Sequence, residues 1–231
     1  MTDTPEDWRA RLLDAAMMHV PFDGWSTATF DAACRDAEVD PGLARAMFPR
    51  GGLDLALAYH AAGDAEMLRR LKETDLSALR FRDRIATAVR LRLEAADREA
   101  VRRGTTLFAL PQHAADGAKA IWGTADLIWK ALGDRSDDIN WYTKRATLSG
   151  VYAATVLFWL GDDSPGAEAT WAFLDRRIED VMRIETAKSK VRESPTLSRL
   201  LAGPIWLAGK IHAPTPRPDG LPGILKRPER P

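Results

Sequence analysis

Residues 146–160 read Ala-Thr-Leu-Ser-Gly-Val-Tyr-Ala-Ala-Thr-Val-Leu-Phe-Trp-Leu and contain no charged side chain. They follow Asp-Ile-Asn-Trp-Tyr-Thr-Lys-Arg at 138–145, which combines two aromatic rings with two cations and an aspartate. A helix that is apolar on every side is normally buried in a large core or in a membrane. The apolar part, residues 146–160, is only about 22 Å long as a helix. A transmembrane helix needs about 20 residues, or about 30 Å. The stretch 138–160 therefore predicts a buried central helix with an exposed, contact-making start.

The rest of the chain carries helix signals and almost no strand signals. Ser, Thr and Asp accept hydrogen bonds from the free amides of a first helical turn, and proline suits the first helical position. From such starts and from the apolar spacing we expect helices over residues 4–20, 26–37, 40–48, 53–72, 79–103, 113–132, 138–160 and 168–190. With the pieces of a further helix near the C-terminus, the sequence predicts an all-α chain of nine or ten helices.

Charge balance and cysteine content limit the classes of function. Lysine plus arginine and aspartate plus glutamate each total 33, so no overall field draws the chain toward nucleic acid or a membrane. Cys34 is the only cysteine, which excludes an internal disulfide and a cysteine-based zinc site. The four histidines are scattered, and the chain has neither a glycine-rich phosphate loop nor a nucleophile elbow. We therefore expect no catalytic residue, no metal and no resident cofactor, and we do not expect an enzyme.

The first seven residues, Met-Thr-Asp-Thr-Pro-Glu-Asp, are acidic and carry no signal-peptide or transit-peptide pattern. No segment reaches the length of a transmembrane span. From these two features we expect a protein of the bacterial cytoplasm.

Residues 26–48 have the layout of a helix-turn-helix motif. The surrounding stretch 24–57 resembles the N-terminal domain of TetR-type repressors. A recognition helix needs donors for base edges and cations for phosphates, but residues 40–47 offer a single arginine, Arg45, and begin with an acid. We therefore expect a helix-turn-helix-like part that does not bind nucleic acid. A TetR-type transcriptional regulator that binds an apolar small molecule is the alternative.

The segment 193–212 differs from the helices before it. Its apolar residues fall within an arc of about 160° on a helical wheel, and Arg199 and Lys210 lie on the opposite side. This pattern is typical of a helix that lies in a membrane interface and equally of a last helix that docks on the core. Pro204 kinks such a helix or divides it into two pieces. The residues expected to bind a membrane surface are Leu197, Leu200, Leu201, Ile205, Trp206, Leu207 and Ile211.

The aromatic pair Trp141-Tyr142 beside Lys144-Arg145 has two interpretations. Exposed Trp, Tyr and Arg are frequent in the energetic centres of protein interfaces, which favours a partner-binding patch. Alternatively, both rings anchor the start of the helix in the core. Successive helical residues differ by about 100°, so the spacing does not decide between the two.

Several motifs together resemble the coenzyme Q (ubiquinone) biosynthesis accessory family known as Coq-nine. They lie at 19–25, 109–112, 121–129, 133–134, 138–145 and 170–181. The most specific motif is Asn-Trp-Tyr-Thr-Lys-Arg at 140–145, and the resemblance covers about residues 9–185.

The resemblance implies a TetR-like fold, usually dimeric, that binds lipid and assists the di-iron hydroxylase acting on demethoxyubiquinone. The ligand would be a phospholipid or a polyprenyl quinone intermediate, presented from the membrane. The resemblance further implies a peripheral position on the membrane, here the bacterial inner membrane. It assigns partner contacts to Asp138, Trp141 and Tyr142, and we add Arg145 to this surface.

We therefore divide the chain into four parts. Residues 1–52 are the helix-turn-helix-like part, 53–192 a lipid-binding helical domain, 193–212 the membrane-binding segment and 213–231 a disordered proline-rich tail. The expected walls of the lipid pocket are the apolar stretches around 121–129 and 146–160. Small residues there leave room for a guest or, alternatively, allow close helix packing. The predicted pocket residues are Trp122, Ile128, Leu148, Val151, Tyr152 and Thr155.

Overall fold

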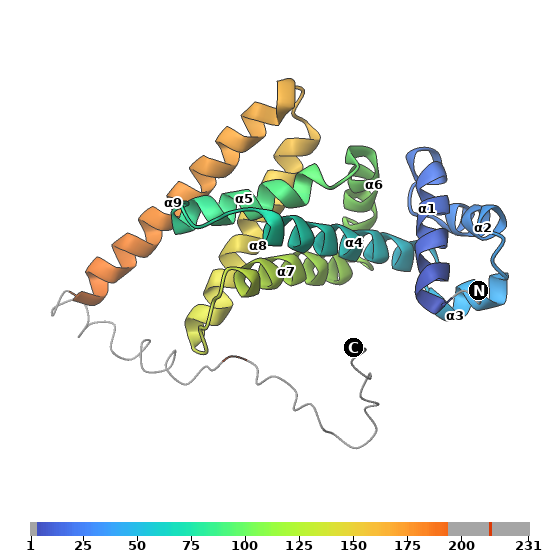
Figure 1. The fold of residues 1–231 in the computed structure, drawn as a ribbon, viewed down its shortest axis with the longest axis horizontal. Coiled ribbons are helices and arrows are strands. Elements are labelled where there is room, and N and C mark those ends of the chain that lie inside the picture. Colours follow the sequence, from blue (N-terminus) through green and yellow to red (C-terminus); the bar gives the residue numbers. More distant parts are fainter. Residues whose placement is uncertain (1–3, 194–212, 214–231) are drawn as a thin grey trace, which may run out of the picture.

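The computed structural model describes residues 4–193 and residue 213, which form nine α-helices and one short 3-10 helix and, within these residues, no strand (Figure 1). The elements are α1 (Pro5–Asp23), α2 (Thr27–Asp36), α3 (Pro41–Met47), α4 (Gly52–Glu73), α5 (Phe81–Glu94), α6 (Arg98–Phe108), α7 (Ala114–Ala131), α8 (Ile139–Leu160), η1 (Pro165–Ala167) and α9 (Glu168–Glu193). The prediction of an all-α chain is confirmed.

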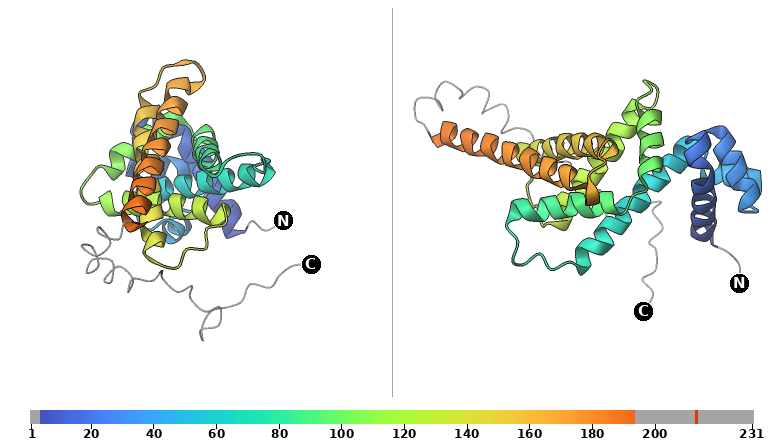
Figure 2. Two further views of the ribbon diagram at one scale, coloured as in Figure 1. Left: turned by 90° about the vertical axis from the view of Figure 1, so that its left-hand side faces the viewer. Right: turned by 90° about the horizontal axis from the view of Figure 1, so that it is seen from above.

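The helices form two groups that α4 connects. Helices α1 to α3 lie at one end of the molecule, and α4 runs from them into a larger body made with α5 to α9 (Figures 1 and 2). Each group has its own apolar core. The smaller core includes Leu12, Val20, Trp25, Phe30 and Phe48. The larger core includes Met67, Val89, Ile128, Leu148 and Leu174.

The predicted helix starts are confirmed at atomic detail. The Thr4 hydroxyl accepts a hydrogen bond from the amide of Asp7, and the Asp7 carboxylate accepts one from the amide of Thr4. Ser26 and Asp40 accept from the amides three residues further on. Asp138 likewise caps α8, accepting from the amide of Asn140 at 2.9 Å. Local sequence signals therefore fix where these helices begin.

Two expected boundaries are wrong. The predicted helix 79–103 is two helices, because Asp97 caps a new one by accepting a hydrogen bond from the Ala100 amide at 2.8 Å. The first helix continues through Pro21 and ends before Gly24, which adopts φ +64°. Glycine takes this left-handed backbone conformation without the steric cost that other residues meet. Gly24, and not Pro21, is therefore the stop signal.

The central helix α8 is less buried than its sequence indicates. Leu148, Tyr152 and Trp159 are among its buried residues, but Leu157 is 61% exposed and Phe158 is 37% exposed. The absence of charge in 146–160 therefore reflects an exposed apolar face as well as a buried one. No helix within the described residues is long and apolar enough to cross a bilayer.

The predicted membrane-binding residues, from Leu197 to Ile211, and the proline-rich tail lie outside the described residues, apart from residue 213. The amide of Ala213 donates a hydrogen bond to the carbonyl of Asp137 at 2.8 Å.

Candidate functional site

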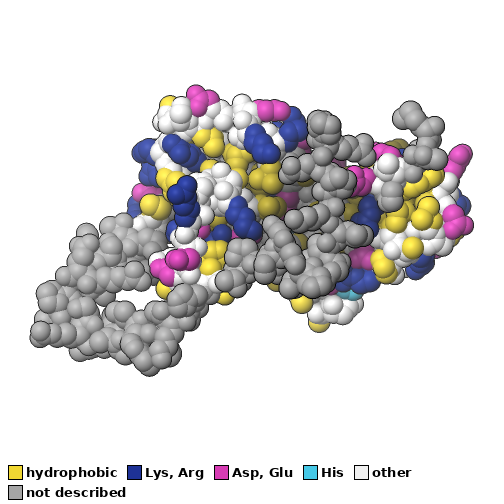
Figure 3. Space-filling model, turned by 60° about the horizontal axis from the view of Figure 1, so that its bottom comes forward, with side chains coloured by type: hydrophobic (Ala, Val, Ile, Leu, Met, Phe, Trp, Pro, Cys, Tyr) yellow, Lys and Arg dark blue, Asp and Glu magenta, His cyan; other side chains and the backbone are white. Residues whose placement is uncertain are grey.

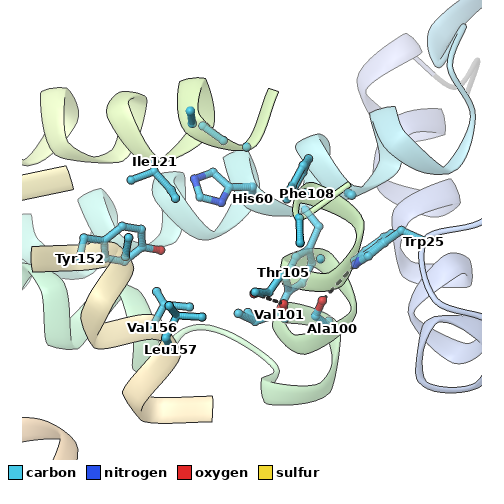
Figure 4. Close-up of a pocket in the computed structure, with 18 of the residues that line it drawn as sticks. Trp25, His60, Ala100, Val101, Thr105, Phe108, Ile121, Tyr152, Val156 and Leu157 are labelled. Atoms are coloured by element: carbon cyan, nitrogen blue, oxygen red, sulfur yellow. Dashed lines mark hydrogen bonds between the residues drawn. The ribbon is translucent and has the colours of Figure 1, made fainter. Parts of the chain in front are cut away.

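A cavity of about 380 Å³ lies between α4, α6, α7 and α8 (Figure 4). Its walls are mostly apolar, and the labelled side chains surround one space, with Trp25 at its far side. Among the lining residues are His60, Val101, Phe108, Ile121, Tyr152 and Val156. The volume falls within the range of about 300–1,000 Å³ that is usual for small-molecule sites.

Small residues on three helices keep the cavity open. Gly104 on α6, Gly117 and Ala118 on α7, and Ala153 on α8 all line it. A Cβ atom at Gly117 would lie 2.7 Å from the Cβ of Phe108, so glycine is required where α6 and α7 approach each other. Gly117 thus allows close packing of α6 and α7, while Ala153 is the one of these small residues that belongs to the predicted wall 146–160.

A buried polar network lies at one side of the cavity, where α4, α5 and α7 meet. The Arg92 Nε donates to Asp64 Oδ1 at 2.7 Å, and Arg92 Nη2 donates to the carbonyl of His60 at 3.0 Å. The Thr124 hydroxyl donates to the same Asp64 carboxylate at 2.9 Å. His60 Nε2 lies 2.8 Å from the Thr124 hydroxyl. The network therefore pairs one buried cation with one buried anion and ties three helices together.

The lining of the cavity is electrically neutral near pH 7. Burial lowers the pKa of His60, which favours the uncharged ring. Burial also raises the pKa of Tyr152 to about 12, so its hydroxyl keeps its proton. Among the described residues, Arg92 is the one charged side chain in the lining, and Asp64 behind it compensates its charge. Such a cavity suits an uncharged, largely apolar guest.

A second cavity of about 650 Å³ lies between α5, α8 and α9 and the loop after α7. Phe81, Leu148 and Val151 form part of its apolar wall, while Asp134 and Lys144 stand at its polar end. Its lining reaches Met182 on α9. Figure 3 shows that, on the face it presents, hydrophobic side chains are interspersed with charged ones.

The structure distributes the predicted pocket residues over three environments. Tyr152 lines the first cavity, and Leu148 and Val151 line the second. Ile128 and Thr155 have no exposed surface, and Trp122 packs with its ring centroid 6.0 Å from that of Trp141; these three line neither cavity.

The wall that α4 and α6 provide, which includes His60, Val101 and Phe108, was not predicted from the sequence. The available signal was the pair of helical glycines at 104 and 117.

The start of α8 forms an aromatic cluster, which we call the α8 head and define as Asp138, Trp141 and Tyr142. Asp138 is exposed and both rings are half-buried. The Trp141 and Tyr142 rings meet edge to face with centroids 4.8 Å apart. The cluster is therefore accessible in part and packed in part, and its burial is compatible with either interpretation.

Arg145 lies inside the molecule and not on the surface where the sequence analysis placed it. Its residue exposure is 1%, its Nε donates to Asp126 at 2.6 Å, and its Nη1 donates to Asp134 at 3.0 Å. Its guanidinium stacks over the Trp141 ring at 4.1 Å from the centroid. The two carboxylates thus bind the Arg145 guanidinium in the interior, where it packs against the Trp141 ring of the α8 head.

Asp134 is the anchor of this ion cluster. Burial of the carboxyl opposes ionisation, but hydrogen bonds from Lys144, Ser136 and Arg145 prevail and lower the pKa of Asp134 to about 2. The Lys144 ammonium donates to Asp134 at 2.7 Å, and its side chain is 36% exposed. One exposed and one buried cation therefore share a single carboxylate.

The helix-turn-helix-like part offers little to nucleic acid. The second helix of the motif, α3, has seven residues, and Arg45 is its only basic residue. The Arg45 guanidinium lies over the Phe30 ring at 4.9 Å and 3.5 Å from the Asp31 carboxylate. Arg45, whose side chain is 51% exposed, is therefore the single cation that this helix offers to phosphates.

Comparison with known proteins gives consistent matches. The model of the family described as COQ9 matches residues 114–185. The chain is 31% identical to ubiquinone biosynthesis protein COQ9, mitochondrial, of Xenopus tropicalis over 82% of its own length and 62% of that protein. It is 30% identical to ubiquinone biosynthesis protein COQ9-B, mitochondrial, of Xenopus laevis over 82% of its length and 67% of that protein.

The fold has a solved counterpart. The crystal structure of a TetR transcriptional regulator from Nitrosomonas europaea superposes with a TM-score of 0.61. The similarity covers 74% of this chain and 95% of that one at 20% identity, and it confirms the predicted TetR-like fold. The chain spans 62% and 57% of the length of the Xenopus tropicalis and Drosophila melanogaster relatives that it matches.

The prediction of a bacterial cytoplasmic location on the inner membrane is wrong. The named COQ9 relatives, from Drosophila melanogaster to Homo sapiens, are described as mitochondrial proteins. The prediction rested on the composition of residues 1–7, which does not determine the compartment in which a protein works.

Proposed function

Because the chain belongs to the COQ9 family, we propose that it is a non-enzymatic accessory protein of ubiquinone biosynthesis. In this proposal it holds an isoprenoid quinone intermediate. It presents this intermediate to a membrane-associated hydroxylase that acts on demethoxyubiquinone. The observation that carries this proposal is the neutral, apolar cavity between α4, α6, α7 and α8. The proposed ligand is a polyprenyl quinone or a phospholipid, and no cofactor is proposed.

The mechanism is physical. A polyprenyl tail is confined to the bilayer because each methylene group exposed to water costs about 0.8 kcal/mol. A cavity that receives the ring and the adjacent chain lowers the free energy needed to bring the ring to an enzyme. Leu157 lines the cavity and is also 61% exposed, so it marks a mouth through which the remaining tail leaves. The segment 193–212 is proposed to rest in the membrane interface and to hold this mouth near the lipid.

Cavity filling tests the carrier role. Ala153 lines the cavity on α8, and Ala146 lies exposed on the same helix away from it. The purified protein, extracted with organic solvent and analysed by mass spectrometry, is expected to release an isoprenoid quinone or a phospholipid. Ala153→Trp should lose this lipid, whereas Ala146→Trp, which adds the same ring on the surface, should retain it. Absence of lipid from the wild-type protein, together with no binding of added quinone, contradicts the carrier role.

The proposed contact surface for the hydroxylase is the α8 head. Trp141→Ala removes a half-buried ring with surface that a partner can reach. We expect it to weaken binding of the hydroxylase in a pull-down while the far-ultraviolet circular dichroism stays that of the wild type. Unfolding of the variant would instead support the core-anchor interpretation. We also propose that the protein forms the homodimer that the family resemblance implies, and sedimentation equilibrium of the same preparation tests this.

A TetR-type regulator that binds an apolar small molecule remains the second candidate, because its fold is the one observed. The presence of a single basic residue, Arg45, on α3 favours the carrier role over this candidate. A gel-shift assay with the promoter region of the protein's own gene separates the two. Sequence-specific DNA binding without any bound isoprenoid overturns the carrier proposal.

A further inference from the structure

The wall of the apolar cavity contains a hydroxyl group that faces the open space. Tyr152 on α8 is 3% exposed, and its hydroxyl oxygen points into the cavity (Figure 4). Among the described residues it makes no hydrogen bond, although two other pairs of cavity residues do, as the dashed lines show. Because the hydroxyl faces the cavity space, it can donate to a molecule that occupies the cavity. An uncharged guest with a hydrogen-bond acceptor would pair with it there.

A second donor lies in the same wall. The Arg92 side chain is 3% exposed and lines the cavity. Its Nε and Nη2 are bound by Asp64 and by the carbonyl of His60, while its Nη1 makes no hydrogen bond to any described residue. Gly63 leaves the space for this guanidinium, since a Cβ atom there would lie 2.6 Å from Nη1. Glycine at position 63 therefore allows the Arg92 guanidinium to lie in the cavity wall.

We propose that Tyr152 and Arg92 form a head-group subsite, an inference that rests on the proposed function. In this subsite the Tyr152 hydroxyl donates a hydrogen bond to a ring carbonyl oxygen of the bound quinone. The apolar walls on either side then contact the ring faces and the first part of the tail. Tyr152 and Val156 lie one turn apart on the same face of α8, and Leu157 follows at the mouth. The ring therefore enters first, and the tail points outward.

The electrostatics of the wall select the class of head group. Asp64 compensates the charge of Arg92, and His60 is held neutral, so an anionic phosphate finds no uncompensated cation here. A pure hydrocarbon leaves the Tyr152 hydroxyl unpaired. A quinone carbonyl is uncharged and accepts hydrogen bonds, so it satisfies the wall without introducing a charge. The subsite thus favours a quinone over both a phospholipid head and an isoprenoid hydrocarbon.

The test compares two guests on full-length protein. Decylubiquinone carries the ring carbonyls, and farnesene is an isoprenoid without any oxygen. We expect Tyr152→Phe to weaken decylubiquinone binding about five- to tenfold and to leave farnesene binding unchanged, because only the hydrogen bond is removed. Tyr59→Phe is the matched control. It also removes a hydroxyl from a tyrosine that lines the cavity, but that hydroxyl already accepts a hydrogen bond from the Asp97 amide at 2.7 Å.

An infrared measurement separates a hydrogen bond from a packing effect. The carbonyl band of bound decylubiquinone should lie at lower wavenumber in the wild type and in Tyr59→Phe than in Tyr152→Phe. Equal weakening of both guests, or the same carbonyl band in all three proteins, overturns the subsite and leaves the carrier role intact. Failure of the wild type to bind either guest overturns the carrier role, and the subsite with it.

Discussion

Replacing Arg145 by Met removes the cation that supports the α8 head while it retains most of the side-chain volume. In the wild type, the guanidinium sits between Asp126 and Asp134 at 2.6 and 3.0 Å, and the side chain is 2% exposed. The variant leaves these two carboxylates near each other without their shared buried partner. We expect unfolding to become easier by about 3–5 kcal/mol, the usual consequence of removing one member of a buried ion pair.

Lys144→Met provides the matched control. Lys144 binds the same Asp134 carboxylate at 2.7 Å, but its side chain is 36% exposed. Ion pairs that remain in contact with solvent contribute about 0–1 kcal/mol. The two variants therefore remove one cation each from one carboxylate and differ mainly in burial.

Urea denaturation followed by tryptophan fluorescence measures both variants, and calorimetry gives the midpoint temperatures. For a chain of this length, Arg145→Met should lower the midpoint by about 6–20 °C and Lys144→Met by no more than about 4 °C. Equal losses in the two variants would refute the reasoning, because burial of Arg145 would then contribute nothing. A stable Arg145→Met protein that no longer binds the hydroxylase would return Arg145 to the partner surface.

Two further predictions concern particular positions. Gly63→Ala should destabilise the protein by about 1–3 kcal/mol, because its new Cβ would lie 2.6 Å from the Arg92 guanidinium. At Gly150 a new Cβ would have no atom within 4 Å. Gly150→Ala should therefore stabilise α8 by up to about 1 kcal/mol in the same urea assay. Because the pKa of Asp134 is lowered in the folded protein from 3.8 to about 2, its ionisation stabilises the fold by about 2 kcal/mol above pH 4. This contribution should disappear as the pH falls from 4 toward 2, so the stability difference between wild type and Asp134→Asn should shrink over that interval; a constant difference would contradict it.

The helical fold was predictable because the signals that define it are local. Thr4, Ser26 and Asp40 each act within their own first turn, and the structure confirms these three caps; Asp138 caps α8 in the same way. The helix boundary at Asp97 also depends on a local cap. It was not predicted because the apolar spacing continues across it and gives no sign that one helix ends and another begins. Family motifs supplied the TetR-like arrangement that spacing does not encode.

The site was less predictable because it depends on contacts between distant parts of the chain. Tyr152, a predicted pocket residue on α8, lines the first cavity, but the opposite wall includes His60 on α4 and Phe108 on α6, which were not predicted. Nothing in the sequence near Arg92 shows that it meets Asp64 across 28 positions. Arg145 was misplaced for the same reason, since Asp126 and Asp134 belong to the preceding helix and its following loop.

The position of the two proposed functional regions on α8 constrains how presentation can occur. Trp141 in the α8 head and Leu157 at the cavity mouth are sixteen residues apart on one helix, a separation of about 24 Å. Tyr152 lies between them on the buried side, so the ring in the proposed subsite does not touch an enzyme bound at the head alone. A hydroxylase that docks on Trp141 must therefore extend along α8 until its own entrance faces Leu157. The exposed large apolar residues of α8, Leu157 and Phe158, lie at the mouth and not between these points, so the proposed transfer to the enzyme takes place at that end of the helix.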